Sequence, residues 1–230
     1  MNVLIKAQAV SKEFYRNRGD SNIFYPVNNV DFTLEEGEIA VISGASGSGK
    51  TTFLNLISGI LPPSDGKIEF LNKEIYTMKD NELSLFRNKN IGVIPQGQTA
   101  IHSLTVMENV LLPFTMYAKD KKLLAAKTEL ANTLLKKLQI DDLKDIMPCE
   151  LSGGELRRMA VARALIMEPS VIIADEPTSD LDEVNTEIVL TILKEAAASK
   201  KGVIIVTHDK EVSEITKSNY KMKDGVLEVK

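Results

Sequence analysis

Apolar and polar residues alternate in several short segments of the chain, which is the pattern of a strand with one buried face. Residues 3–10 alternate well enough for a strand, and residues 30–34 alternate more clearly. Residues 68–75 are typical of a small hairpin, and residues 220–229 form a second hairpin pattern around an Asp-Gly pair. The first three segments together predict an antiparallel sheet.

Four other segments are largely apolar, at residues 38–42, 91–94, 171–174 and 203–206. Apolar runs of this length fit strands that are buried on both faces. A helical pattern at residues 183–199 separates the last two runs. A helix between two buried strands is the usual crossover of a parallel sheet, so we predict a parallel sheet here.

The chain between these strands has a helical character. Thr105 and Glu108 have the spacing of a capping box at the start of an apolar run. Residues 121–139 carry leucines at helical spacing, and the helical stretch continues past residue 160. We interpret residues 98–168, approximately, as a helical subdomain inserted in a single domain of residues 1–230. The apolar positions of the second helix are Leu123, Leu124, Leu130, Leu134 and Leu138.

A glycine-rich loop of the form G-x-x-x-x-G-K-[ST] follows the strand at 38–42 and precedes a helical pattern. Its glycines let the backbone wrap around a phosphate with the N–H groups inward, and the helix N-terminus adds a positive end. Lys50 can reach the β- and γ-phosphates, and the Thr51 hydroxyl can hold Mg²⁺. The flanking strand and helix favour this interpretation over a glycine-rich turn with an accidental lysine. The predicted nucleotide-binding residues are Gly44, Ala45, Ser46, Gly47, Ser48, Gly49, Lys50, Thr51 and Thr52.

Asp175 and Glu176 come directly after the apolar strand at 171–174. The carboxyl ends of parallel strands line the ligand crevice of such a sheet, so both carboxylates are expected beside the phosphate loop. Asp175 is placed to support Mg²⁺, directly or through water. Glu176 is then a candidate general base that polarises the attacking water.

These elements predict an α/β fold, with a phosphate-loop NTPase core built on a parallel sheet, an antiparallel β subdomain and an inserted helical subdomain. The net charge of −4 and pI near 5.4 give no support for nucleic-acid binding. Basic pairs such as Arg157-Arg158 are expected on solvated helix faces. The single cysteine, Cys149, excludes an intramolecular disulfide and fits a reducing compartment.

The N-terminal residues lack the basic start and long apolar stretch of a signal peptide. No apolar run approaches the roughly 20 residues that cross a bilayer. If the protein works at a membrane, another chain must supply the spans.

Residues 151–155 carry a second glycine-containing motif, in which Ser152 can cap a helix that begins near Gly153 and Glu155 completes a capping box. The glycines expose backbone N–H groups at a positive helix end, which forms an anion site. The motif is Leu151, Ser152, Gly153, Gly154 and Glu155. With the phosphate loop, it makes the whole chain closely resemble the ATP-binding-cassette ATPases.

The resemblance implies ATP and Mg²⁺ as cofactors and a homodimer in the ATP-bound state. Two chains would sandwich two ATP molecules head to tail, with residues 151–155 of one chain meeting the γ-phosphate on the other. The resemblance also places Val27 beside the nucleotide. The loop that crosses the dimer interface would be Ser179, Asp180, Leu181 and Asp182.

Other positions match the family by motif. Gln96 resembles the glutamine that touches Mg²⁺ and water and links to the helical subdomain, and Gln98 is a less favoured substitute. His208 resembles the histidine that contacts the γ-phosphate, so we include it with Glu176 as a catalytic residue. The aromatic ring that stacks on adenine corresponds to Phe14 or to its neighbour Tyr15.

The chain departs from the family at Glu155, where glutamine is more common. Both residues can close the capping box, so the helix start should persist. A carboxylate near a triphosphate is electrostatically less favourable than an amide, and we therefore expect weaker ATP-driven dimerisation.

The resemblance implies the ATP-hydrolysing subunit of a bacterial membrane transporter, peripheral on the cytoplasmic face of the cell membrane and bound to an integral-membrane permease supplied by another chain. Residues 104–110 and 174–178 look most like the subgroup of lipoprotein-release, macrolide-export and cell-division ATPases. The cargo would be a lipoprotein, peptide or drug. An alternative is mechanical signalling that regulates cell-wall hydrolysis without a transported solute. A cassette ATPase of DNA repair or translation is disfavoured by the acidic charge and the short distance between the two glycine motifs.

Overall fold

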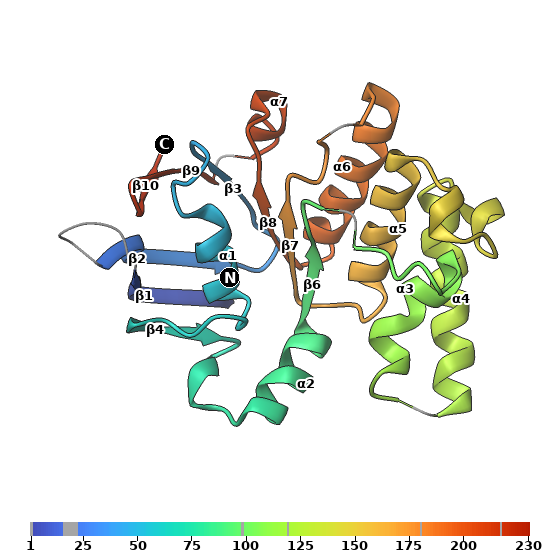
Figure 1. Ribbon diagram of the computed structural model, residues 1–230, viewed down its shortest axis with the longest axis horizontal. Helices are drawn as coiled ribbons and strands as arrows, with labels where there is room; N and C mark the ends of the chain where they lie inside the picture. Colours follow the sequence, from blue (N-terminus) through green and yellow to red (C-terminus); the bar gives the residue numbers. More distant parts are fainter. Residues whose placement is uncertain (1, 16–22, 98, 119, 180, 217) are drawn as a thin grey trace.

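The computed structural model describes residues 2–15, 23–97, 99–118, 120–179, 181–216 and 218–230. An antiparallel sheet lies at one end of the molecule, and helices α3 and α4 lie at the other (Figure 1). A second, mainly parallel sheet and helices α5 and α6 occupy the space between them (Figure 1). The predicted α/β class with an antiparallel sheet beside a parallel one is confirmed.

The antiparallel sheet has the strand order β2-β1-β4-β5. Its β4–β5 hairpin matches the predicted one, and Leu71 and Asn72 take positive φ angles of 51° and 61° between the two strands. The first strand runs past residue 10 to Tyr15, further than its alternation predicts. Bulges shift the register between Val10 and Phe14, which breaks the period-two pattern while the strands stay paired. The strands are β1 (Val3–Tyr15), β2 (Ile23–Glu35), β4 (Asp65–Phe70) and β5 (Lys73–Glu74).

The second sheet has the order β10-β9-β3-β8-β7-β6. Strands β9, β3, β8, β7 and β6 pair in parallel, and β9 and β10 form the predicted hairpin. Its turn residues Asp224 and Gly225 have φ angles of 48° and 81°. The strands are β3 (Ile39–Ser43), β6 (Ile91–Ile94), β7 (Val171–Asp175), β8 (Gly202–Val206), β9 (Ser218–Lys223) and β10 (Val226–Val229).

Apolar side chains fill the space on both faces of the parallel strands, as continuous apolar runs require. Val41, Ile172 and Ile205 point into the cluster that includes the helices α3 to α6. Ile42 and Ile204 belong to the other cluster, which includes the antiparallel sheet and helix α1. The parallel sheet is therefore a fixed central layer, and its carboxyl edge can hold side chains in precise positions.

Helices and short 3₁₀ turns connect the strands. The crossover helix α6 lies between β7 and β8, as predicted from the pattern of residues 183–199. None of the helices in the described parts of the chain is long and apolar enough to cross a membrane. The helices are α1 (Lys50–Ile57), α2 (Asp80–Asn90), α3 (Val106–Thr115), α4 (Lys121–Lys137), α5 (Gly153–Leu165), α6 (Glu183–Ala198) and α7 (Lys210–Ser213), with 3₁₀ turns η1 (Ile75–Thr77), η2 (Asp141–Leu143) and η3 (Pro148–Glu150).

Helices α3, α4 and α5 pack against one another in the region predicted to be helical. The predicted capping box is present: the Glu108 backbone N–H donates to the Thr105 hydroxyl at 3.2 Å, and the Thr105 N–H donates to the Glu108 carboxylate at 2.8 Å. The predicted apolar face of α4 is partly wrong, because Leu123 and Leu124 are exposed. The buried residues of α4 lie in its later turns, at Ala131, Leu134 and Leu135.

Candidate nucleotide-binding and catalytic site

The phosphate loop ends at Gly49, which is the N-cap of α1 and has a φ of 107°. No side chain caps this helix, so the N–H groups of its first turn stay available to a ligand. A Cβ atom at Gly49 would lie 1.8 Å from the Pro26 carbonyl oxygen, and one at Gly44 would lie 2.3 Å from that of Met222. The glycines are therefore required by the close approach of neighbouring backbone as well as by conformation.

Lys50 donates hydrogen bonds to the backbone of the phosphate loop. Its ammonium donates to the carbonyl oxygens of Gly44 at 2.6 Å and Ala45 at 2.9 Å. Burial lowers the pKa of the Lys50 ammonium, and the nearby carboxylates of Glu176 and Asp175 oppose that shift. The charge is thus held in a position from which it can attract phosphate oxygens.

Ser48 is tied to a distant part of the chain. Its carbonyl oxygen accepts a hydrogen bond from the Gly225 N–H at 3.2 Å, in the turn between β9 and β10. Its hydroxyl is buried and has no hydrogen-bond partner in the part of the chain that the structure describes. A spare donor inside the loop fits a site that is shaped around further acceptor atoms, such as phosphate oxygens.

A cavity of about 330 Å³ opens over the phosphate loop. It brings together most of the predicted loop residues, without Gly44, Ala45 and Ser48, and the four residues Gln96, Asp175, Glu176 and His208, which come from the ends of three parallel strands. Two lining residues, Phe24 and Pro26 on β2, were missed by the sequence analysis. The walls are formed by Phe24, Pro26, Ser46, Gly47, Gly49, Lys50, Thr51, Thr52, Gln96, Asp175, Glu176 and His208.

The residues that line this cavity do not include Phe14, Tyr15 or Val27. Phe14 stacks on Phe24 with ring centroids 5.7 Å apart, and Tyr15 is 72% exposed. The Val27 side chain is fully buried in the core, so it has no surface to offer a nucleotide, and the preceding Pro26 lines the cavity instead. The cross-strand pairing of Phe14 with Phe24 is the signal from which Phe24 could have been found.

Thr51, Gln96 and Asp175 fit a magnesium site. All three line the same cavity and offer oxygen atoms, the ligands that Mg²⁺ prefers. In the described ranges, no group of three or more His, Cys, Asp or Glu side chains could hold a metal. Mg²⁺ would therefore draw most of its ligands from phosphate and water, as is usual for nucleotide sites. When bound, it would neutralise charge on the phosphates.

Asp175 occupies an electrostatically unfavourable position. Burial and the adjacent Glu176 raise its pKa, and the positive charges of Lys50 and Arg157 partly oppose the shift. A half-buried carboxylate of this kind gains from a cation beside it. The position fits the predicted magnesium ligand.

Glu176 is fixed by its backbone. Its N–H donates to the Val206 carbonyl at 2.8 Å, and its φ of 49° lies in the left-handed region. Its side chain is 12% exposed, and His208 Nε2 lies 3.6 Å from its carboxylate oxygen. The two groups face the same cavity over the phosphate loop, where an acceptor and a donor for the terminal phosphate and its attacking water are needed.

The second glycine motif forms the predicted N-terminus of α5. The Glu155 N–H donates to the Ser152 hydroxyl at 3.3 Å, and the Glu155 carboxylate accepts from both the Ser152 N–H and its hydroxyl at 2.7 Å. These hydrogen bonds lower the pKa of Glu155, so the carboxylate is ionised at neutral pH. Leu151 packs partly buried against the helical core, while Gly153 is exposed.

The predicted interface loop lies between β7 and α6. Asp182 caps α6, because its carboxylate accepts from the Asn185 N–H at 2.8 Å, and the Leu181 N–H donates to the Thr178 carbonyl at 3.2 Å. Ser179 donates to the Glu176 carbonyl at 3.0 Å. The predicted Asp180 and the alternative glutamine Gln98 lie outside the described residues.

Arg157 and Arg158 were expected on a solvated face, and this expectation is wrong. Arg158 is buried and donates to the Asn185 side chain. Arg157 donates to the carbonyl oxygens of Pro95 at 2.6 Å and Gln96 at 2.7 Å. A sequence pattern shows charge and period but not the neighbouring loops, so it could not reveal these bonds.

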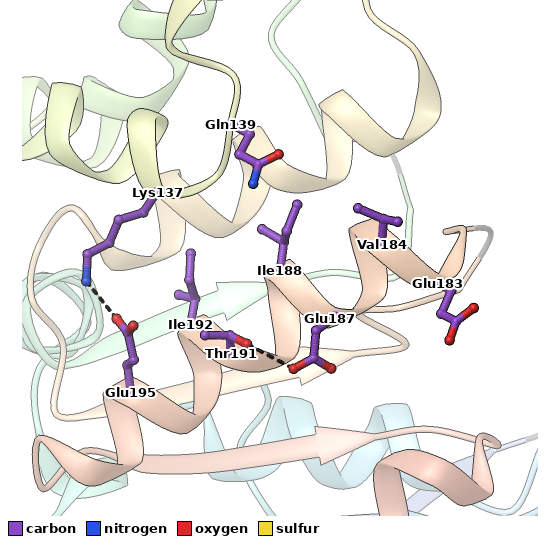
Figure 2. Close-up of a pocket in the computed structure, with 9 residues that line it drawn as sticks. All are labelled: Lys137, Gln139, Glu183, Val184, Glu187, Ile188, Thr191, Ile192 and Glu195. Atoms are coloured by element: carbon purple, nitrogen blue, oxygen red, sulfur yellow. Dashed lines mark hydrogen bonds and ion pairs between the residues drawn. The ribbon is translucent and has the colours of Figure 1, made fainter.

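A larger cavity, of about 550 Å³, lies between the end of α4 and helix α6 (Figure 2). Its floor is apolar at Ile188 and Ile192, and Glu183, Glu187 and Glu195 stand along α6 (Figure 2). Carboxylates repel phosphate, and Lys137, which also lines this cavity, is paired with Glu195 at 2.6 Å, so the lining is unfavourable for a nucleotide.

The comparisons with known proteins agree with this geometry. A family model described as "ABC transporter" matches residues 27–179. The lipoprotein-releasing system ATP-binding protein LolD of Buchnera aphidicola is 41% identical, over 90% of this chain and 89% of its own length. The LolD protein of Aquifex aeolicus is 39% identical over 86% of this chain and 88% of its own length.

Solved structures give the same result. A dimeric bacterial ABC transporter cassette superposes with a TM-score of 0.89 and 33% identity, covering 98% of this chain and 97% of that chain. A dimeric cassette in a post-hydrolysis state with bound ADP and Pi superposes with a TM-score of 0.87 and 32% identity, covering 98% of both chains.

Proposed function

This chain belongs to the ABC transporter family as its ATP-hydrolysing subunit, and from that premise we propose how its residues act and what the complex moves. Two copies bind head to tail, so that the phosphate loop of one copy and residues 151–155 of the other enclose one ATP. The dimeric form of the similar cassettes supports this arrangement.

The observation that carries the proposal is the freedom of Gly153. A Cβ atom at this position would meet nothing within 4 Å, and the residue is not in a left-handed conformation. Neither packing nor backbone geometry within one chain requires glycine there. A requirement from outside the chain explains it, and a phosphate approaching the exposed N-terminus of α5 is such a requirement.

Within the cavity over the phosphate loop, each side chain has a proposed role. Lys50 holds the β- and γ-phosphates, and Thr51, Gln96 and Asp175 hold the magnesium ion. Glu176 accepts a proton from the attacking water, and His208 donates to the γ-phosphate, which its 58% exposure leaves it free to reach. The first-turn N–H groups of α1 stabilise the charge on the phosphates throughout.

The membrane partner is a separate permease that binds near Gln96 and the helical subdomain and holds the chain at the inner face of the cell membrane. A cavity of about 240 Å³ lies there between α2, β6 and α5. Two apolar side chains at it, Ile60 and Val93, are 57% and 40% exposed. An apolar segment of the permease would cover them, and nucleotide-driven motion of the Gln96 loop would reach the permease directly.

The proposed cargo is a lipoprotein that is extracted from the membrane. This proposal is supported by relatives named as the ATP-binding protein of a lipoprotein-releasing system at 35–41% identity over most of the chain. ATP closes the dimer, hydrolysis reopens it, and the difference in ATP affinity between the two states drives the permease.

The test is a pull-down of Glu176→Gln from native membranes with Mg-ATP, followed by mass spectrometry. The substitution should remove the base and keep the ATP-bound dimer, so the working complex is trapped. A stoichiometric integral-membrane protein supports the proposal, and recovery of a soluble dimer alone contradicts it. The Lys50→Met variant, which should not hold ATP, is the matched control.

Cargo is tested separately in spheroplasts depleted of the chain. After depletion, lipoproteins should accumulate in the membrane. Their release into the medium should resume when the wild-type chain is restored, but not when Glu176→Gln is. Unchanged lipoprotein release with altered cell-wall hydrolysis would instead support mechanical signalling.

A further inference from the structure

Arg157 lies where three segments of the chain meet. It stands in the second turn of α5, and its guanidinium donates to the carbonyl oxygens of Pro95 at 2.6 Å and Gln96 at 2.7 Å. The same side chain donates to the Ser179 hydroxyl at 3.1 Å. One side chain therefore joins helix α5, the loop after β6 and the loop after β7.

The bond to Ser179 continues toward the candidate general base. The Ser179 hydroxyl donates to the Glu176 carbonyl oxygen at 3.0 Å, and the Ser179 N–H reaches the same oxygen at 3.2 Å. A hydroxyl that donates to one group and accepts from another transmits position between them. The chain of bonds thus runs from Arg157 through Ser179 to the backbone of Glu176.

The backbone conformation of Glu176 has to be maintained by hydrogen bonds to other residues. Its positive φ is unfavourable for residues other than glycine and persists only where surrounding hydrogen bonds maintain it. One such bond comes from the Val206 carbonyl on β8, and the other comes through Ser179. The Ser179 hydroxyl that makes the second bond accepts in turn from Arg157 on α5.

We infer that Arg157 is a positioning residue for ATP hydrolysis, which holds Gln96 and Glu176 in fixed positions relative to helix α5. The inference rests on the roles proposed above for Gln96 and Glu176. Because both residues are tied to one guanidinium, a movement of α5 changes the water-binding and proton-accepting positions together. The step it affects is the hydrolytic one, and nucleotide binding by the phosphate loop does not depend on it.

Arginine is needed for this role because its planar fork places two donor nitrogens at fixed separation, whereas lysine offers one point charge. Arg163, also on α5, gives a contrast within the same helix. It donates to the Thr99 carbonyl at 2.8 Å and so holds the same loop after β6. Its other hydrogen bond is to the Thr99 hydroxyl, so among the described residues both of its bonds go to the loop after β6. Arg163 therefore anchors one segment, and Arg157 connects two.

The test compares the full-length Arg157→Lys, Arg157→Met and Ser179→Ala variants with the double variant Arg157→Met/Ser179→Ala. We expect Arg157→Met to lower kcat about tenfold to a hundredfold, since a displacement of about 1 Å at reacting groups has effects of that size. The KM and the affinity for a fluorescent ATP analogue with Mg²⁺ should stay within about twofold, because the phosphate loop is unaffected. Arg157→Lys should recover less than half of kcat although it keeps the charge.

The double variant identifies the connection. If Arg157 acts on Glu176 through Ser179, the double variant should be no slower than Arg157→Met alone, so that the two effects are not additive. Lys127→Met is the control, because Lys127 also donates to a backbone carbonyl, that of Ile166 at 2.8 Å, but far from the cavity. It should change the melting temperature without changing kcat.

Three results would overturn the inference. They are a kcat within twofold of wild type in Arg157→Met, full recovery by Arg157→Lys, or equal losses of kcat in Arg157→Met and Lys127→Met that follow their melting temperatures. Glu176→Gln is measured in parallel. If Glu176→Gln keeps the wild-type kcat, the proposed role of Glu176 as the base is wrong. If Glu176→Gln is inactive while Arg157→Met is fully active, only the inference about Arg157 is contradicted.

Discussion

The N-termini of α1 and α5 use the same backbone chemistry in opposite ways. Both present N–H groups of a first helical turn near glycines. At α1 the cap is Gly49 and no side chain satisfies the donors. At α5 the Ser152 hydroxyl and the Glu155 carboxylate already form a capping box. The first-turn N–H groups of α1 have no side-chain acceptor, whereas those of α5 are partly satisfied by side chains of the same helix.

The glycines differ in the same sense. Gly49 is confined by the backbone of its own chain, because an added Cβ would lie 1.8 Å from the Pro26 carbonyl oxygen. Gly153 is confined by nothing in its own chain. The glycine at the α1 end is thus explained within one copy, whereas the glycine at the α5 end is not, which fits the proposed contact with a second copy. Binding at α1 should be a property of the monomer, and binding at α5 should be a property of the dimer.

The largest expected effect separates Gly49→Ala from Gly153→Ala. Gly49→Ala should lower ATP affinity more than a hundredfold or prevent folding, because the added methyl overlaps a backbone oxygen at a φ that disfavours alanine. Gly153→Ala should fold with wild-type stability and bind ATP normally as a monomer, yet lose ATP-dependent dimerisation. Calorimetric titration with ATP and analytical ultracentrifugation measure the two properties. Weak ATP binding by a Gly153→Ala monomer would contradict the assignment of α1 to the monomer and α5 to the dimer.

A smaller effect is expected from Glu155→Gln, which keeps the capping box but removes the negative charge. The Ser152 hydroxyl donates to the Glu155 carboxylate at an O···O distance of 2.7 Å, so it is not free to donate to an arriving phosphate. We expect the variant to dimerise with ATP several-fold more tightly, since roughly 1 kcal/mol of charge repulsion is about fivefold in affinity. Sedimentation of the hydrolysis-deficient Glu176→Gln form with and without the change measures it. Equal dimer affinities would show that the charge is unimportant.

The pH dependence of that difference follows from the hydrogen bonds. Hydrogen bonds from Ser152 lower the pKa of Glu155, so its carboxylate stays ionised at a lower pH than an ordinary glutamate does. The advantage of Glu155→Gln should therefore be constant between about pH 6 and 8. A difference that vanished on going from pH 8 to pH 6 would mean that Glu155 takes up a proton in the dimer.

The smallest effects concern stability and have opposite signs at the two sites. Burial raises the pKa of Asp175, so the fold disfavours its charge, and this cost is full above the folded pKa and absent below the ordinary carboxyl pKa. Asp175→Asn should raise Tm at pH 7 by about 2 °C, lose this advantage below about pH 4, and abolish hydrolysis.

Ser152→Ala should lower the free energy of unfolding by about 1 kcal/mol through loss of the cap of α5. Differential scanning calorimetry at pH 7 and pH 4 tests both, and a lower Tm for Asp175→Asn would contradict the assignment.

The parts that the sequence predicted are those governed by local chemistry. The capping boxes at Thr105 and Ser152 depend on residues three positions apart, and the phosphate loop depends on one short segment with a strand before it. The Asp-Gly turn before β10 is equally local. In each case residues close in sequence determine the backbone geometry and its hydrogen bonds, so the pattern and the structure agree.

The parts that the sequence did not predict depend on contacts between distant segments. Phe24 reaches the nucleotide cavity because β2 pairs with β1, and Val27 is buried for the same reason. Arg157 has the pattern of a surface residue, but the loops after β6 and β7 close around it. The roles of such residues are set by which strands become neighbours, and single-sequence periodicity does not encode that order.

The position of β3 in its sheet has a consequence for the synthesis of the protein. This strand, which leads into the phosphate loop, pairs only with β8 and β9 among the described strands. Its partners leave the ribosome roughly 160 residues later, which at 5–20 residues per second is about 10–30 s. During that interval an apolar strand has no sheet to join, and the loop after it has no support from Gly225. The phosphate loop is therefore made early but gains its support from β8, β9 and Gly225 only near the end of synthesis.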